Sequence, residues 1–131
     1  MLMTTIYLRD AAEVPFPLTC EQFQAALQDR YPQARSTINA VVPDKRFTFA
    51  SLDLADDSRS LSYFEQAGLV LEDGDGGVWA PVVEWFLSVL PADLAVLMMT
   101  EIDLGRDLRL PPRADAAQIA QIYDILVAGY E

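Results

Sequence analysis

Histidine is absent from this chain of 131 residues, and cysteine occurs once, at Cys20. Without an imidazole base, Ser-His and Cys-His catalysis are excluded. Zinc and most transition metals need histidine or cysteine ligands, so no site for them is expected. A single cysteine also excludes an internal disulfide. Cys20 stands at the start of a predicted helix, where a thiolate can be stabilised, unless it serves simply as a small apolar residue.

Basic residues are scarce and unevenly placed. Lys plus Arg number 9 against 20 Asp plus Glu, which gives a formal net charge of −11, and no basic residue occurs between Arg59 and Arg106. A field of this sign repels phosphate backbones and anionic membrane surfaces, so direct binding to nucleic acid or to a membrane is not expected. It favours a basic protein partner, although acidity also simply keeps a protein soluble.

Signatures of nucleotide binding and of export are missing as well. There is neither a GxGxxG motif after a strand nor a GxxxxGK[ST] motif, so we predict no cofactor. Residues 1–10 lack a basic segment followed by an apolar run, so we predict no signal peptide and expect a cytoplasmic, bacterial protein. Segment 78–99 is apolar and long enough to span a bilayer, but Glu84, Pro91 and Asp93 interrupt it. We interpret it as a buried helix followed by a buried strand.

The apolar content, in contrast, is ample. At 52% it suffices for one core, and no linker, repeat or low-complexity segment interrupts residues 1–131, which are expected to form a single domain. Two helices have the clearest local signals. Thr19 and Gln22 form a capping box before the first, and Asp115 with Gln118 begins a C-terminal helix.

The other segments predict mainly strands. Strands are expected at 4–9, 36–42, 46–54 and 94–103, a helix at 81–91, a short helix at 61–68, and a turn or short edge strand at 104–112. Phe47 and Phe49 share one face of their strand, whereas Leu52 and Leu54 fall on the other, so we expect a bulge or the strand's end near Ser51. The order predicts an α+β fold, with a mixed or mostly antiparallel sheet of about five to six strands packed by three main helices.

The segment LEDGDGG, residues 71–77, raises the question of a calcium site. Asp73 and Glu84 stand at the first and twelfth positions of an EF-hand loop, but a β-branched residue occupies the sixth, where glycine is required. A metal site is therefore not predicted. We interpret the segment as the turn of a β-hairpin, with Gly74 and Gly76 supplying positive φ.

Glu84 interrupts a predicted helix that is otherwise apolar nearly all round. If it were buried, the pKa of its carboxyl would rise and it could act as an acid or base, alone or with Glu101 or Asp103. On the solvent face, or paired with an arginine, it would have no such role.

Small size, acidic charge and missing catalytic groups favour a protein-binding module rather than an enzyme. We expect it to neutralise a basic protein partner, as bacterial toxin immunity proteins do, with apolar anchors at the centre and charges at the rim. The candidate partner-binding residues are carboxylates near predicted turns and strand ends: Asp53, Asp56, Asp57, Glu72, Asp73 and Asp75. Two alternatives stay open, namely a carboxylate-dependent enzyme or ligand binder that uses Glu84, and an inhibitor that imitates the charge of DNA.

Overall fold

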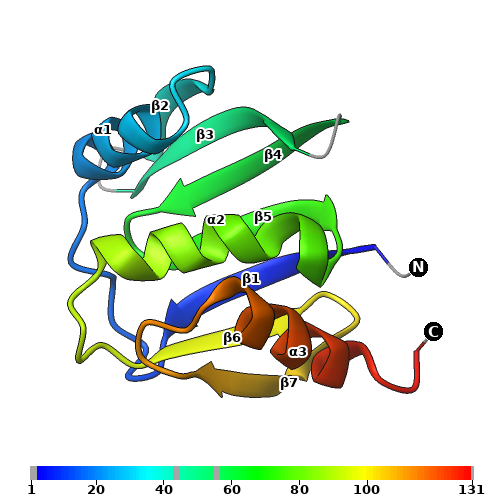
Figure 1. Ribbon diagram of the computed structural model, residues 1–131. Coiled ribbons are helices and arrows are strands. Elements are labelled where there is room, and N and C mark those ends of the chain that lie inside the picture. The colour runs from blue at the N-terminus through cyan, green and yellow to red at the C-terminus, as the bar shows by residue number, and fades with distance from the viewer. Residues whose placement is uncertain (1–2, 43–44, 55–56, 131) are drawn as a thin grey trace.

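The computed structural model describes residues 3–42, 45–54 and 57–130. Within these residues, seven strands form one sheet and three helices lie on one of its faces (Figure 1). The strands are β1 (Thr4–Asp10), β2 (Arg35–Val42), β3 (Lys45–Leu54), β4 (Asp57–Phe64), β5 (Gly68–Gly74), β6 (Val96–Thr100) and β7 (Asp103–Leu110). The helices are α1 (Cys20–Arg30), α2 (Gly76–Val89) and α3 (Ala116–Val127).

Neighbouring strands of the sheet are antiparallel throughout, in the order β2-β3-β4-β5-β1-β6-β7. The predicted α+β class with a mostly antiparallel sheet and three main helices is therefore confirmed. The sheet is larger than expected, because residues 61–64 belong to a strand rather than to a short helix and because β7 is a full strand.

The core lies between the helices and the sheet face that they cover. Alternate residues of β1 are buried, so Ile6 and Leu8 point into this layer. Phe23 of α1 stacks on Tyr63 of β4 with a ring-centroid distance of 4.6 Å, and Phe86 of α2 contacts both rings. Fully burying a large apolar side chain stabilises the fold by about 1.5–3 kcal/mol, so this aromatic cluster fastens α1 and α2 to the sheet.

Both predicted capping boxes are confirmed. The Thr19 hydroxyl accepts a hydrogen bond from the main-chain N–H of Gln22 at 3.1 Å, and the Thr19 N–H donates to the Gln22 side chain at 2.9 Å. Asp115 and Gln118 make the same reciprocal pair at α3, at 2.8 and 3.0 Å. These local bonds satisfy main-chain donors that a helix start leaves free, and this explains why the sequence signal was sufficient.

The short helix predicted at 61–68 is wrong. Leu61 and Tyr63 are buried against the helices, and the Tyr63 hydroxyl donates to the main-chain oxygen of Leu18 at 2.6 Å. These long-range contacts require the extended conformation and outweigh the local helical pattern. Glu65, just after β4, accepts from the main-chain N–H of Cys20 at 2.6 Å and so caps α1.

The β-hairpin predicted around residues 74–76 is wrong too, because α2 begins at Gly76. Asp75 is its N-cap and accepts from the N–H of Val78 at 2.9 Å. Positive φ occurs at Asp73, at 32°, and not at Gly74 or Gly76. This positive φ lies within β5, where the pairing of β1 with β5 shifts register between Leu71 and Gly74, and aspartate tolerates the left-handed region.

Gly74 and Gly76 are needed because an aromatic side chain packs directly against each of them. A Cβ atom on Gly74 would lie 2.3 Å from the indole nitrogen of Trp79, and one on Gly76 would lie 2.7 Å from the Cβ of Tyr123. Tyr123 belongs to α3, so the glycine at the start of α2 lets the two helices approach closely.

The bulge expected near Ser51 is absent, because β3 pairs with β4 without interruption from Phe47 to Leu54. Thr48, Ala50 and Leu52 are buried under the helices. Phe47 and Phe49 therefore point to the opposite face of the sheet, and the change of parity means that both faces of β3 carry apolar residues.

Candidate protein interface

The sheet face that the helices leave uncovered carries apolar side chains. They are Tyr7, Phe47, Phe49, Phe64, Val70, Leu97, Met99 and Leu104, and none belongs to the core cluster. The face of a sheet that meets water normally carries polar residues, so this apolar composition makes the face a candidate interaction surface. We call this set the open-face patch.

Strand register makes the patch continuous. One row crosses five strands, from Phe49 through Ser62, Val70 and Tyr7 to Met99. In the adjacent row Phe47 lies opposite Phe64, and their rings stack at a centroid distance of 5.2 Å. Rows of this kind bring side chains into contact across strands, so the patch forms one surface.

A groove of about 350 Å³ lies in this surface. Its walls are Tyr7, Leu8, Arg9, Phe64, Ala67, Gly68, Leu69, Val70, Met99 and Leu104. Gly68 lies opposite Arg9 of β1, and a Cβ atom at this position would clash with the main-chain oxygen of Leu8, so β1 and β5 approach closely in the groove wall. A hollow of this size and apolar lining can accept an aromatic or aliphatic side chain of a partner.

The one charged group of the groove wall is already neutralised. Arg9 donates to Glu13 at 2.7 Å and lies 3.7 Å from Asp107, and the Glu13 contact chiefly raises the pKa of the guanidinium. Two carboxylates surround one cation, so the groove does not favour an anionic ligand.

The predicted partner-binding carboxylates gather at one end of the sheet, on the right in Figure 1. β3 ends there, β4 begins there and β5 ends there, because Leu54 lies opposite Asp57 and Leu61 opposite Leu71. The first residues of β1 and the turn from β6 to β7 lie at the same end. We call the following set the acidic end: Asp53, Asp57, Glu72, Asp73, Asp75, Glu101 and Asp103. Asp56 lies outside the described residues.

More of the ion pairs in the described chain lie at the opposite end of the sheet. Among the described residues, Arg9 and Arg46 make ion pairs there, Arg46 with Glu21 and Glu65. At the acidic end, the described residues include an ion pair between the guanidinium of Arg59 and the carboxylate of Asp57, 3.6 Å apart. Arg35, opposite Ser51 of β3, and Arg30, in the same pocket as Asp53, also lie at the acidic end, where the carboxylates outnumber the basic side chains.

The carboxylates of the acidic end divide into two kinds. Some have structural hydrogen bonds: Asp75 caps α2, Glu101 accepts from Thr5 N–H at 3.0 Å, and Asp103 accepts from the Tyr130 hydroxyl at 3.3 Å. The side chains of Asp53, Glu72 and Asp73 have no such bond to any other described residue and are exposed.

Asp53 and Glu72 connect the acidic end to the open-face patch. Each follows a patch residue at even spacing in its strand, Asp53 after Phe49 and Glu72 after Val70, so it points to the same face. An apolar surface thus has carboxylates along one border, which is the arrangement of a protein interface with an apolar centre and a charged rim.

Glu84 has a structural position, and its interpretation as a buried acid or base is wrong. The side chain lies on the exposed face of α2, and one carboxylate oxygen accepts from the main-chain N–H of Ala116 at 3.0 Å. Ala116 is the first residue of α3, so Glu84 caps that helix from a neighbouring one.

Cys20 is fully buried, and burial raises the pKa of its thiol. Desolvation outweighs any stabilisation of a thiolate by the helix start, so the residue behaves as a small apolar side chain. Across residues 3–42, 45–54 and 57–130, no three His, Cys, Asp or Glu side chains are grouped so that they could hold a metal ion.

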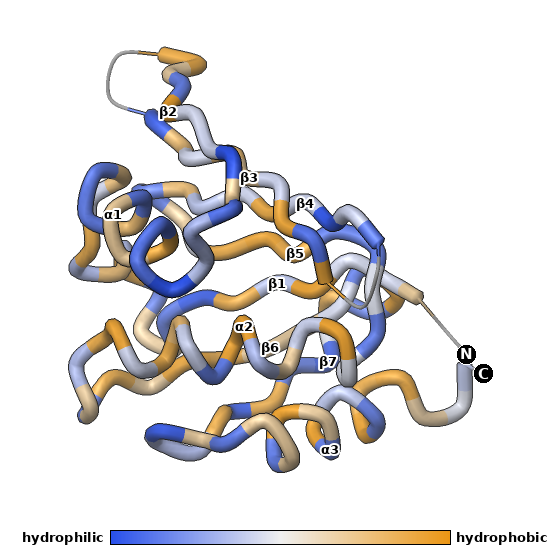
Figure 2. The backbone as a smooth tube through the Cα atoms, turned by 45° about the horizontal axis from the view of Figure 1, so that its top comes forward, coloured by the Kyte–Doolittle hydropathy of each residue, from blue (hydrophilic) through white to orange (hydrophobic). Residues whose placement is uncertain are grey.

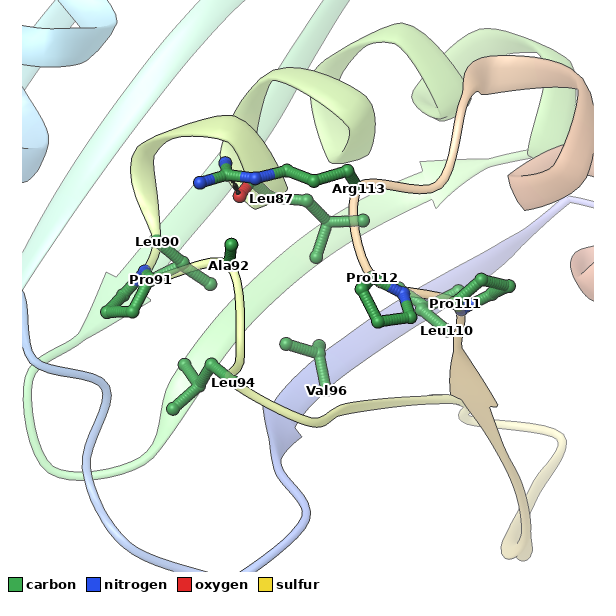
Figure 3. Close-up of a pocket in the computed structure, with 10 residues that line it drawn as sticks. All are labelled: Leu87, Leu90, Pro91, Ala92, Leu94, Val96, Leu110, Pro111, Pro112 and Arg113. Carbon is green, nitrogen blue, oxygen red and sulfur yellow. Dashed lines mark hydrogen bonds between the residues drawn. The ribbon is translucent and has the colours of Figure 1, made fainter.

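An enclosed cavity near the end of α2 is too small for a ligand. Its volume of about 10 Å³ has room for a water molecule at most, between the loop that follows α2 and the segment 111–113. Arg113 lies across it and donates to the main-chain oxygen of Leu87 at 2.7 Å (Figure 3). This contact caps the carbonyl end of α2 and is structural.

Segment 78–99 divides as expected into a buried helix, most of α2, and a buried strand, β6. In the part of the chain that the structure describes, no helix combines the length and the apolar character needed to cross a membrane. No protein-family model, curated protein or solved structure matches this chain.

Proposed function

We propose that this chain is a protein-binding module, and that the open-face patch and the acidic end together hold and mask a basic protein partner. The observation that supports the proposal most is the row from Phe49 to Met99, apolar except at Ser62, on an uncovered sheet face bordered by Asp53 and Glu72. In its sharpest form the partner is a toxin whose basic cleft is covered, as bacterial immunity proteins cover their toxins.

The patch supplies the apolar anchors. Phe49 is 38% exposed and Leu104 is 59% exposed, so both offer apolar area that a partner can bury at about 25 cal/mol per Å². The groove between them accepts a side chain in return. Interfaces of this type concentrate their binding energy in a few central aromatic contacts.

The acidic end orients the approaching partner and selects partners with basic surfaces. Asp53, Glu72 and Asp73 need not break a structural bond to meet lysine or arginine side chains, since their carboxylates have none within the described chain. Uncompensated charge accelerates encounter with a basic surface and is screened by salt.

The experiment compares two variants of equal charge. Asp53→Asn, Glu72→Gln and Asp73→Asn together neutralise three carboxylates of the acidic end. The matched control is Asp29→Asn, Asp93→Asn and Asp124→Asn, which neutralises three exposed carboxylates elsewhere. Each purified protein is used to capture binders from lysate of the native cell, at low and moderate salt, and the retained proteins are identified by mass spectrometry.

We expect one basic protein to be retained stoichiometrically by the wild type and by the control, to be released by salt, and to be lost by the acidic-end variant. Equal loss in both variants would show that only net charge matters, and equal retention would exclude the acidic end. Retention of a DNA-processing enzyme that added DNA displaces would favour the DNA-mimic alternative. The enzyme alternative required a buried Glu84, but this side chain lies on the exposed face of α2. Glu84→Gln is therefore expected to change only the stability of the protein.

A further inference from the structure

Strand β5 passes from the groove to the acidic end. Gly68 and Val70 line the groove, and Glu72 points to the same face of the sheet because it follows Val70 at even spacing. Figure 2 shows the change along this strand, which is apolar in its middle and hydrophilic toward its end. Successive residues of a strand are about 3.3 Å apart, so the four steps from Gly68 to Glu72 span about 13 Å. One segment of a partner can therefore contact both places.

The groove favours an aromatic side chain. Its lining includes the rings of Tyr7 and Phe64 and the thioether of Met99, and its volume is about 350 Å³. Rings and thioethers both make favourable contacts with a further ring. Arg9, the charged residue of the lining, is held by two carboxylates, and its guanidinium is attracted to the face of an aromatic ring. An indole or phenyl group of the partner therefore fits this lining better than an aliphatic or polar group.

A cation is favoured at Glu72 and not at the other border of the groove. The Glu72 carboxylate is exposed and accepts no hydrogen bond from any other described residue. At the other border, Glu13 and Asp107 lie beside Arg9. Arg109 lies in the same row across the sheet as Arg9 and adds a second guanidinium. Two cations and two carboxylates balance there, so that border does not select a charged group of either sign.

Neither Arg35 nor Arg59 neutralises Glu72. Arg35 belongs to β2, three strands away from β5, which corresponds to about 14 Å across the sheet. Arg59 lies opposite Leu52, a residue buried under the helices, so its side chain points to the covered face of the sheet. There it donates to the main-chain oxygen of Asp73. Glu72 is therefore available to a cation that a partner supplies.

We propose that the partner docks through two groups about 13 Å apart, an aromatic side chain in the groove and a lysine or arginine side chain at Glu72. This inference rests on the proposed function and specifies the chemistry of the partner. The aromatic group supplies the central apolar contact. The cation sets the direction in which the partner segment lies along β5, because only one border of the groove has an uncompensated carboxylate.

The test uses the purified chain labelled with ¹⁵N and an acetylated, amidated peptide, Trp-Gly-Ser-Gly-Arg, whose outer residues are about 13 Å apart when it is extended. We expect saturable shifts of the main-chain amide signals of Gly68, Val70 and Glu72. A peptide with alanine in place of the tryptophan should bind about tenfold more weakly, because a buried ring is lost. A peptide with glutamine in place of the arginine should bind about two- to fivefold more weakly and should no longer shift the Glu72 signal.

Ala67→Phe distinguishes the groove from general apolar attraction. Ala67 is an exposed residue of the groove wall, so a phenyl ring there fills the hollow although it adds apolar surface. Thr37→Phe is the matched control, because Thr37 is exposed on the same sheet face, opposite Phe49 and outside the groove. We expect Ala67→Phe to weaken binding of the Trp-Gly-Ser-Gly-Arg peptide about tenfold and Thr37→Phe to leave it unchanged.

The absence of saturable shifts, equal affinity of the tryptophan and alanine peptides, or full affinity in Ala67→Phe would overturn the inference. Capture of a basic protein from lysate tests the proposed function separately. A chain that captures such a protein but does not bind the peptide would keep the proposed function and lose this inference. A chain that binds the peptide as expected but captures nothing would lose the proposed function, and the preference of the groove for an aromatic side chain would stand.

Discussion

Arg46 connects α1, β3 and the turn that follows β4 through charge. It lies on β3, and its guanidinium donates to both carboxylate oxygens of Glu21, on α1, at 2.7 and 2.6 Å. It also donates to Glu65, which itself caps α1. These hydrogen bonds from Arg46 lower the pKa of Glu21 from 4.5 to about 2, and they lower the pKa of Glu65.

The lowered values predict a specific response to acid. A carboxyl whose pKa is lower in the folded state stabilises the fold above its unfolded pKa, near 4.5, and that contribution disappears as the pH falls toward about 2. Arg46→Met should remove this part of the pH dependence. We therefore expect the free energy of unfolding to fall less in this variant than in the wild type between about pH 5 and pH 2, as measured with urea.

Arg30→Met is the matched control for this prediction. It removes the same charge, but Arg30 lies over the ring of Tyr31 and makes no ion pair within the described residues. Its acid response should equal that of the wild type. An Arg46→Met protein whose stability falls as steeply as the wild type would show that the Glu21 and Glu65 contacts contribute nothing measurable to folding.

At the scale of elements, the sequence predicted what depends on neighbouring residues. The capping boxes at Thr19 and Asp115 use partners three residues away, so α1 and α3 could be predicted. β4 could not, because its extended conformation depends on the contact of Tyr63 with α1. Glu65 caps α1 through Cys20, forty-five residues earlier in the chain, and local spacing cannot reveal a contact of this range.

The start of α2 was missed for a related reason. Two consecutive glycines disfavour a helix locally, so Gly76 and Gly77 suggested a turn. The structure shows that Gly76 is needed where α2 approaches α3, since a Cβ atom there would lie 2.7 Å from Tyr123. Close packing between helices, and not local preference, determines this boundary.

Gly76→Ala should therefore destabilise the protein although alanine is the better helix former. Overpacking of this kind costs about 1–3 kcal/mol, which exceeds the helix preference of about 1 kcal/mol. Gly77→Ala is the internal comparison. A Cβ atom on Gly77 would approach only the side chain of Asp75, at 3.3 Å, so stability should change by less than about 1 kcal/mol. Thermal or urea unfolding of both variants measures the difference, and equal stabilities would contradict the close approach of α2 and α3.

At the scale of the whole molecule, the carboxylates of the acidic end could be predicted from the sequence, whereas the open-face patch could not. The candidate carboxylates were chosen because they stand near strand ends, and antiparallel topology brings the described ones to one end of the sheet. The open-face patch requires knowledge of which sheet face the helices cover. The parity change between Phe49 and Leu52 was the available signal, and it was attributed to a bulge instead of to a strand with two apolar faces.

The open-face patch makes the account of function testable at one place. Phe49→Ser with Leu104→Ser removes the two exposed apolar side chains of the patch, which are 38% and 59% exposed. Val14→Ser with Ile125→Ser is the matched control, because those residues are 52% and 53% exposed and lie outside the patch. Both variants should fold, since each side chain meets solvent already.

The most direct measurement is the amount of basic protein that each of these variants retains from native-cell lysate at moderate salt, relative to the wild type. We expect the control to retain as much as the wild type and the Phe49→Ser, Leu104→Ser variant to retain at least about tenfold less, because central apolar contacts are removed. Equal retention by both variants would contradict this expectation, because the uncovered face of the sheet would then take no part in binding.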